Sequence, residues 1–200
     1  MKESFINTIV YAESTPNPSA MKFVSSRSLI DGSPIEFTSS DLAQPSPLAS
    51  KLFSFPFVSG VFIASNFVTI SKTVHVEWHD IQSNVREFLQ DYLSKGLPVL
   101  NESVVTEKSK IVSGDEITGE KPTSEVDIKI VEILDEYIKP AVESDGGAIT
   151  FKSFKNGIVT VLLQGSCSGC PSSRITLKAG IEALLKRLLP EVNEVVAEEI

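Results

Sequence analysis

The chain has 200 residues, of which 42% are hydrophobic and 22% are charged, a composition typical of soluble globular proteins. A formal net charge of −8 disfavours nonspecific binding to nucleic acid or to an anionic membrane. The sequence has no run of about 18 apolar residues, so no transmembrane helix is expected, and residues 1–21 show neither a signal-peptide core nor an arginine-rich presequence. We therefore expect a cytoplasmic protein whose cysteines stay reduced.

Residues 1–100 mix strand and helix patterns, which predicts a small α+β domain. The expected strands are short apolar segments at residues 9–12, 20–25 and 34–37, followed by a hairpin over 57–72 that turns near Ser65 and Asn66.

Two helices are expected in the same region. The first is short, covers residues 48–55 and ends before Pro56. The second covers residues 80–95, where apolar residues repeat at helical spacing. Asp80 is the expected N-cap of this second helix, and Gly96 is the residue expected just after its end.

Residues 101–124 contain no aromatic residue and no sustained apolar period. They mix charges with Ser, Thr, Gly and one Pro, which predicts a flexible, solvated linker between two acidic domains. The predicted division is therefore a domain over 1–100, a linker over 101–124 and a domain over 125–200.

Residues 125–200 predict elements in the order αββαβ, enough for a two-layer domain of sheet and helices. The expected elements are a helix over 126–138, strands over 148–154 and 158–165, a helix through 177–188 and a strand over 192–199. Pro140 is expected to end or kink the first helix, and Asn156-Gly157 to form a hairpin turn. The nearly continuous apolar run at 158–165 predicts a central strand. Both domains are thus expected to be small α/β sandwiches of the α+β class.

The only two cysteines, Cys167 and Cys170, lie in the stretch GSCSGCPSS. The predicted elements place them between the end of a buried strand and the start of a helix. Gly165 and Gly169 have no β-carbon, so we expect the backbone to bend tightly there and to expose both sulfurs.

The residues after the cysteines favour thiolates, the form that binds metal. Residues 171–173, with the sequence Pro-Ser-Ser, suit the start of a helix, whose free amides and positive dipole end lie near the sulfurs. Arg174 would add positive charge beside them.

Four interpretations of the cysteine pair are open. Two buried, inert cysteines are disfavoured by the flanking glycines and serines. A thioredoxin-like dithiol oxidoreductase shares the arrangement of strand, C-x-x-C and helix. Here, however, the proline follows the second cysteine, no tryptophan precedes the first, and three strands are fewer than that fold needs. A structural zinc site needs two more ligands. The only histidines, His75 and His79, lie on either side of Glu77 in the other domain. For that stretch a polar surface or a turn is the favoured interpretation.

The fourth interpretation is an iron–sulfur cluster shared by two copies of the chain. Two cysteines from each copy make four thiolates, enough for a [4Fe–4S] cluster or, as a second option, a [2Fe–2S] cluster. Such a site would be exposed and exchangeable, which suits a carrier.

The sequence also resembles a known family. The segments IKPAVES, DGGAITF and VTVLLQGSCSGCPSSRITLKAGIEALLKRLLPEV resemble the C-terminal domain of NifU, which Nfu-type iron–sulfur carriers share, over roughly residues 126–197. The segments TPNPSAMKF (15–23) and FPFVSGVFIASNFVTISK (55–72), with Glu77 and Trp78, resemble the Nfu N-terminal domain.

This resemblance implies a carrier that binds a [4Fe–4S] cluster through Cys167 and Cys170 of two subunits and passes it to apo-proteins, without a catalytic residue. The implied partners are apo-protein clients, an upstream scaffold and a second copy of the chain, with no nucleic acid and no membrane, and the N-terminal domain would contribute partner choice. Ala148 stands where the family usually has an acidic residue, and Ser166 where it often has alanine; the Ser166 hydroxyl could tune a neighbouring sulfur. The cysteine-rich domains of full-length NifU are missing, so de novo cluster assembly with a sulfur donor is not implied.

Overall fold

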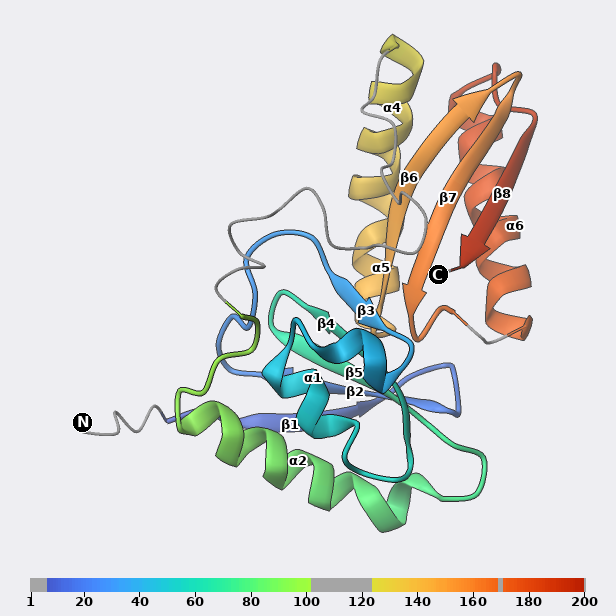
Figure 1. Ribbon diagram of the computed structural model, residues 1–200. Coiled ribbons are helices and arrows are strands. Elements are labelled where there is room, and N and C mark those ends of the chain that lie inside the picture. Colours follow the sequence, from blue (N-terminus) through green and yellow to red (C-terminus); the bar gives the residue numbers. More distant parts are fainter. Residues whose placement is uncertain (1–6, 102–123, 169–170, 200) are drawn as a thin grey trace. The chain divides into compact units, whose positions relative to one another are not determined.

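The structure, a computed structural model, describes residues 7–101, 124–168 and 171–199, and the side chains of all of these except 171–174 and 199. The chain forms two compact units, one from residues before 102 and one from residues after 123, which Figure 1 labels element by element. Helices and strands build a separate sheet in each unit, which confirms the predicted α+β class. Most of the predicted linker lies outside the described residues.

The first unit is a five-stranded antiparallel sheet with helices packed on one face. Its elements are β1 (Val10–Ser14), β2 (Ala20–Ser25), β3 (Ile35–Phe37), the 3-10 helix η1 (Ser40–Ala43), α1 (Pro47–Leu52), β4 (Val58–Ala64), β5 (Phe67–Lys72) and α2 (Trp78–Ser94). The strands lie in the order β1-β2-β5-β4-β3. The predicted hairpin is confirmed as β4 and β5, with Ser65 and Asn66 in its turn.

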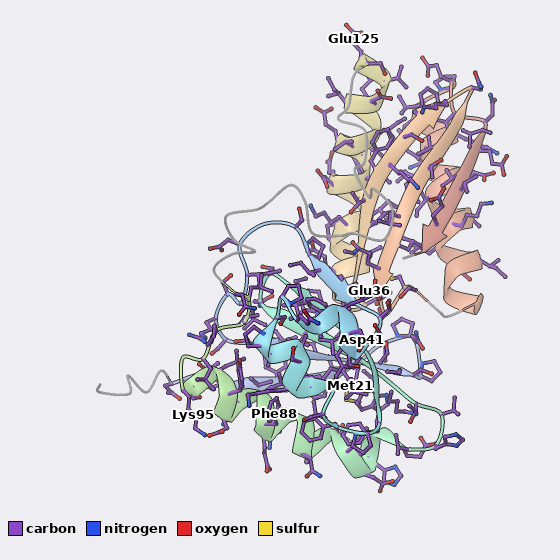
Figure 2. The ribbon with its side chains drawn as sticks, in the orientation of Figure 1. Met21, Glu36, Asp41, Phe88, Lys95 and Glu125 are labelled. Atoms are coloured by element: carbon purple, nitrogen blue, oxygen red, sulfur yellow. The ribbon has the colours of Figure 1, made fainter. Side chains whose placement is uncertain are left out.

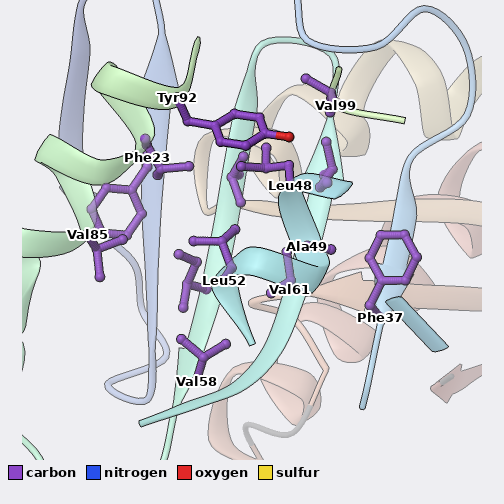
Figure 3. Packing of buried hydrophobic residues seen from close by; sticks show 14 of the residues in the cluster. Phe23, Phe37, Leu48, Ala49, Leu52, Val58, Val61, Val85, Tyr92 and Val99 are labelled. Carbon is purple, nitrogen blue, oxygen red and sulfur yellow. The ribbon is translucent and has the colours of Figure 1, made fainter. Parts of the chain in front are cut away.

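The core of the first unit lies between its sheet and its two α-helices. Leu48 and Leu52 of α1 and Val85 and Tyr92 of α2 pack in one cluster with strand residues such as Val61 (Figure 3). Burying a large apolar side chain of this kind contributes about 1.5–3 kcal/mol. The buried apolar side chains of α2 therefore hold this helix on the sheet, and their helical spacing is the pattern seen in the sequence.

Helix α2 begins earlier than the sequence predicted. It starts at Trp78 with Glu77 as its N-cap, so the prediction of an N-cap at Asp80 is wrong. Asp80 lies in the first turn, where its negative charge complements the helix dipole. Trp78 explains the early start, because its Nε1 donates to Pro18 O at 3.1 Å and its ring packs edge-on against Phe23, with 6.2 Å between ring centroids.

The far end of α2 matches the prediction. Gly96 follows the helix with a φ of 65°, a left-handed conformation that favours glycine. At this end of the helix, Lys95 Nζ donates to the Asp91 carboxylate at 2.6 Å. Figure 2 labels Lys95, and also Phe88 two turns earlier in the helix. An exposed pair of this kind adds only about 0.3–0.5 kcal/mol.

The second unit is a three-stranded sheet with the order β6-β7-β8. Its elements are α4 (Glu125–Ile133), η2 (Leu134–Ile138), α5 (Lys139–Ser144), β6 (Gly147–Lys155), β7 (Ile158–Gly165), α6 (Pro171–Leu188) and β8 (Glu194–Glu199). Strand β7 pairs antiparallel with β6 and parallel with β8. The predicted αββαβ order and the central position of residues 158–165 are confirmed. Side chains of α4, η2, α5 and α6 pack on one face of this sheet.

Pro140 interrupts the first helix of the second unit but does not end it. The helical backbone continues to Ser144. Segment η2, which directly precedes the helix α5 that contains Pro140, is π-helical. Because Pro140 has no N–H to donate to residue 136 and its ring would clash with that carbonyl, a widened turn at this point accommodates it. The helix therefore reaches the turn at Asp145 that precedes β6.

The two end residues of the predicted linker are hydrogen-bonded to the flanking units. The Asn101 backbone N–H donates to Pro45 O at 2.9 Å, and its Nδ2 donates to Gln44 O at 3.0 Å. Ser124 caps α4: its Oγ accepts from the Asp127 N–H at 3.1 Å, and Asp127 Oδ2 accepts from the Ser124 N–H at 3.0 Å.

Glu182 joins α6 to β8. Its carboxylate accepts from Lys186 Nζ at 2.5 Å and from the Val195 N–H at 3.1 Å. These hydrogen bonds, that of Lys186 first, hold the pKa of the Glu182 carboxyl below its usual value. The helix that follows the cysteines is thereby fixed to the edge strand of the sheet.

The hairpin turn between β6 and β7 generates the first testable prediction. Gly157 has a φ of 80°, and a β-carbon there would lie 2.2 Å from Asn193 Nδ2. We expect Gly157→Ala to lower the free energy of unfolding by about 2 kcal/mol, because alanine disfavours this backbone conformation and Asn193 must move. Urea denaturation measures the change. Gly180→Ala is the control, since its β-carbon would meet no atom within 4 Å and alanine favours a helix; equal effects of the two substitutions would contradict the prediction.

Candidate metal-binding site

The cysteine motif lies between a central strand and a helix, as the sequence predicted. Strand β7 ends at Gly165, and α6 begins at Pro171. Gly165 has a φ of 69°, so the predicted tight bend is present at this position. Cys167 follows two residues later, whereas Gly169 and Cys170 lie outside the described residues.

The Cys167 side chain is covered by its own unit. The residue is 7% exposed and belongs to the hydrophobic cluster of the second unit, which also contains residues of β6, β7 and α6. The expectation that the glycines expose this sulfur is therefore wrong for Cys167. Its burial agrees with the inert-core interpretation, so the burial alone does not assign the chemistry.

The close approach of β6 to the sulfur explains where Cys167 lies. A β-carbon built on Gly147 would be 2.7 Å from Cys167 Sγ and 2.7 Å from Gln164 O. No other residue type fits between the two strands at this point without a shift. Gly147 was identified in the sequence only as part of the segment DGGAITF. Its steric role could be found only in three dimensions, because it lies 20 positions before Cys167.

Ser166 fastens the start of the cysteine loop to the turn before β6. Its N–H donates to Gly146 O at 3.2 Å, and its Oγ donates to Asp145 O. The same Oγ lies 3.9 Å from Cys167 Sγ, which is within hydrogen-bonding distance for sulfur. The predicted contact between this hydroxyl and a sulfur is therefore present in the structure.

The start of α6 provides an electrostatic feature that suits an anionic ligand. The helix has 18 residues, so its N-terminal amides and dipole place partial positive charge directly after the cysteine motif. The side chains of residues 171–174, which include Arg174, lie outside the described residues, and their effect on the thiolates stays a prediction.

The histidines form no metal site with their neighbours in the described residues. Residues 74–76 form a turn or bend before α2, as the favoured interpretation of this stretch predicted. His79 is largely exposed and lies 3.0 Å from the Asp80 carboxylate. Within the described part of the chain, no group of three or more His, Cys, Asp and Glu side chains could hold a metal ion.

Comparison with protein families identifies both units. A family model described as the scaffold protein Nfu/NifU N terminal matches residues 10–96, and a model described as the NifU-like domain matches residues 130–196. Both cysteines lie within the second match.

Curated relatives match along both units. The NFU1 iron-sulfur cluster scaffold homolog, mitochondrial, of Drosophila ananassae is 38% identical over 190 residues, which cover 94% of this chain and 64% of that protein. The protein of the same name from Drosophila persimilis is 38% identical over 187 residues, covering 93% and 64%. The chain thus spans slightly less than two thirds of the length of these relatives.

A structural relative is a NifU-like protein from Saccharomyces cerevisiae, solved by solution NMR. It is 27% identical, with a TM-score of 0.42, over 46% of this chain and 84% of that chain.

The names of the relatives contradict the predicted location. They are called mitochondrial, which points away from the cytoplasm. The cytoplasmic prediction rested on the missing targeting pattern in residues 1–21, and such an absence does not decide the compartment. On the question of a membrane, the described helices include none with the length and apolar character needed to cross one.

The contact between Gly147 and Cys167 generates a second prediction. We expect Gly147→Ala to lower the free energy of unfolding by about 1–3 kcal/mol and to displace Cys167, because both neighbours of the added carbon belong to one packed strand end and its loop. Urea denaturation and the rate of Cys167 alkylation report the two effects. Gly60→Ala is the matched control in another strand, where the nearest side-chain atom would be 3.4 Å away. A Gly147→Ala protein as stable as the control, with unchanged alkylation, would refute the contact.

Proposed function

Because the chain belongs to the Nfu family of iron–sulfur cluster scaffold proteins, we propose that it carries a [4Fe–4S] cluster between two copies and delivers it to apo-proteins. The ligands are Cys167 and Cys170 of each copy. A [2Fe–2S] cluster is the second option for the same four thiolates.

The observation that carries this proposal is the number and position of the cysteines. The chain has two, both in the segment that matches the NifU-like domain, whereas these clusters take four protein ligands. A second copy related by a twofold axis supplies the missing pair. The motif lies between the end of β7 and the start of α6, and the dipole of such a helix start favours thiolate, which supports the proposal.

In this proposal the cluster is cargo. An upstream scaffold delivers it, four thiolates hold it, and cysteine thiolates of the client replace them one after another. Each step exchanges one iron–sulfur bond for another, so no catalytic base is required and the protein acts as a carrier rather than an enzyme. The net charge of −8 favours clients with basic docking surfaces.

The first unit has a separate role in the proposal. It would select the partner, while the second unit pairs with its copy and holds the cluster. We retain the division into a domain over 1–100, a tether over 101–124 and a domain over 125–200, with Asn101 and Ser124 bonded to the flanking units. A tether lets one domain reach clients while the other dimerises. By similarity to its relatives, we place this activity in the mitochondrion.

A thioredoxin-like dithiol oxidoreductase is the alternative. The described part of the second unit has a three-stranded sheet, smaller than that fold needs, which favours the carrier. A third class, a metal-free adaptor acting through the first unit, would not need the cysteines.

Anaerobic reconstitution with iron and sulfide tests the proposal. We expect a brown dimer with about four irons, because each copy supplies two of four thiolates. Native mass spectrometry reports the subunit count and the cluster mass together. Cys167→Ser and Cys170→Ser should each abolish cluster binding while the far-UV circular dichroism stays unchanged. His75→Ala is the control, since it removes a metal-binding residue type outside the site and should leave loading unchanged.

Two outcomes would contradict the carrier. A colourless monomer that turns over in a disulfide-reduction assay would favour the oxidoreductase. Undiminished rescue of client maturation by the double serine variant would favour the adaptor.

A further inference from the structure

The covered position of Cys167 conflicts with a cluster shared between two chains. A shared cluster requires each ligating sulfur to face the partner copy, whereas this sulfur packs inside its own unit against Gly147. Loading therefore requires the loop after β7 to turn the sulfur outward. The question is which interactions hold the loop in its present arrangement.

We propose that Ser166 is a positioning residue that keeps Cys167 covered while the site is empty and that releases it for cluster loading. This inference rests on the proposed carrier function. The two hydrogen bonds from Ser166 to the turn before β6, from its N–H to Gly146 O and from its Oγ to Asp145 O, are here called the Ser166 tie.

The tie joins two segments that are distant in sequence. Ser166 is 2% exposed, so water does not compete strongly for its hydroxyl. Its partners lie in the turn that follows α5, about 20 residues earlier. The hydroxyl oxygen is also 3.9 Å from Cys167 Sγ, so it forms part of the wall around the sulfur. Turning Cys167 outward moves Ser166 away from both carbonyls.

Ser168, on the other side of Cys167, makes a different kind of contact. Its Oγ donates to Gly165 O at 2.8 Å, and its N–H donates to the same oxygen at 3.1 Å. These two bonds connect residues of the same short loop and leave the turn before β6 untouched. The two serines therefore form a matched pair: each hydroxyl donates to a carbonyl, that of Ser166 to the turn before β6 and that of Ser168 to its own loop.

Thiol alkylation of the full-length, cluster-free chain tests the tie. In a Cys170→Ser background Cys167 is the only thiol, so N-ethylmaleimide reports its accessibility alone. We expect Ser166→Ala to raise the alkylation rate about fivefold, the effect of losing one hydrogen bond. Ser168→Ala should change the rate by less than about twofold.

A second readout separates local opening from general destabilisation. Local opening of the loop exposes little surface, so the alkylation rate of the Ser166→Ala protein should hardly change in low concentrations of urea. A rate that rises steeply with urea would mean that the thiol reacts through global unfolding, and this would overturn the positioning role.

Two further results would overturn the inference. One is an unchanged alkylation rate for Ser166→Ala, and the other is an equal rise in the alkylation rate for both serine variants. If Ser166→Ala does not fold, the alkylation rate of the parent Cys170→Ser protein tests the covered arrangement of Cys167. A rate at least about tenfold slower than in concentrated urea supports that arrangement, and an equal rate refutes it. The assay needs no cluster, so a failed reconstitution would overturn the proposed function separately.

Discussion

The last pair of the β6–β7 ladder, where Gly147 lies opposite Gly165, fixes the position of the cysteine loop. Strand β7 pairs with β6 along its whole length, whereas its pairing with β8 ends at Leu163, so the end of β7 is held by β6. The chain turns at Gly165 and brings Cys167 onto Gly147, where a β-carbon would come within 2.7 Å of the sulfur. The absence of a β-carbon at Gly147 therefore leaves the space in which the Cys167 sulfur lies.

The proposed carrier function places two opposing requirements on this loop. The cysteine pair must bind a cluster firmly enough to hold it and loosely enough to surrender it. In the proposed carrier, two thiolates per chain meet the second requirement, because each copy would supply only half of the ligands and the interface could separate. The packed strand end holds Cys167 inside its own unit, so the first requirement is met only after the loop has turned the sulfur outward. The first unit, with its own sheet and core, adds nothing to the ligand set in the described residues.

Local patterns predicted most of the fold. The hairpin at Ser65 and Asn66, the Asn156-Gly157 turn and the central strand 158–165 follow from side-chain period and turn chemistry, which act over a few residues. Where long-range contacts compete, the predictions were less accurate. Trp78 starts α2 early because it bonds to the loop at Pro18, and the helix passes Pro140 by widening into a π turn.

The sequence alone determined which chemistry is possible: it contains two cysteines spaced C-x-x-C, a strand before them, a helix after them, and motifs that identify the family. Only the tertiary structure decided that Cys167 lies covered, against Gly147 and beside Ser166, and that Ser166 is tied to Asp145 and Gly146. The reason is physical. Residue spacing sets local conformation, but the accessibility of a sulfur depends on which distant backbone approaches it, and the register of β6 on β7 sets that approach.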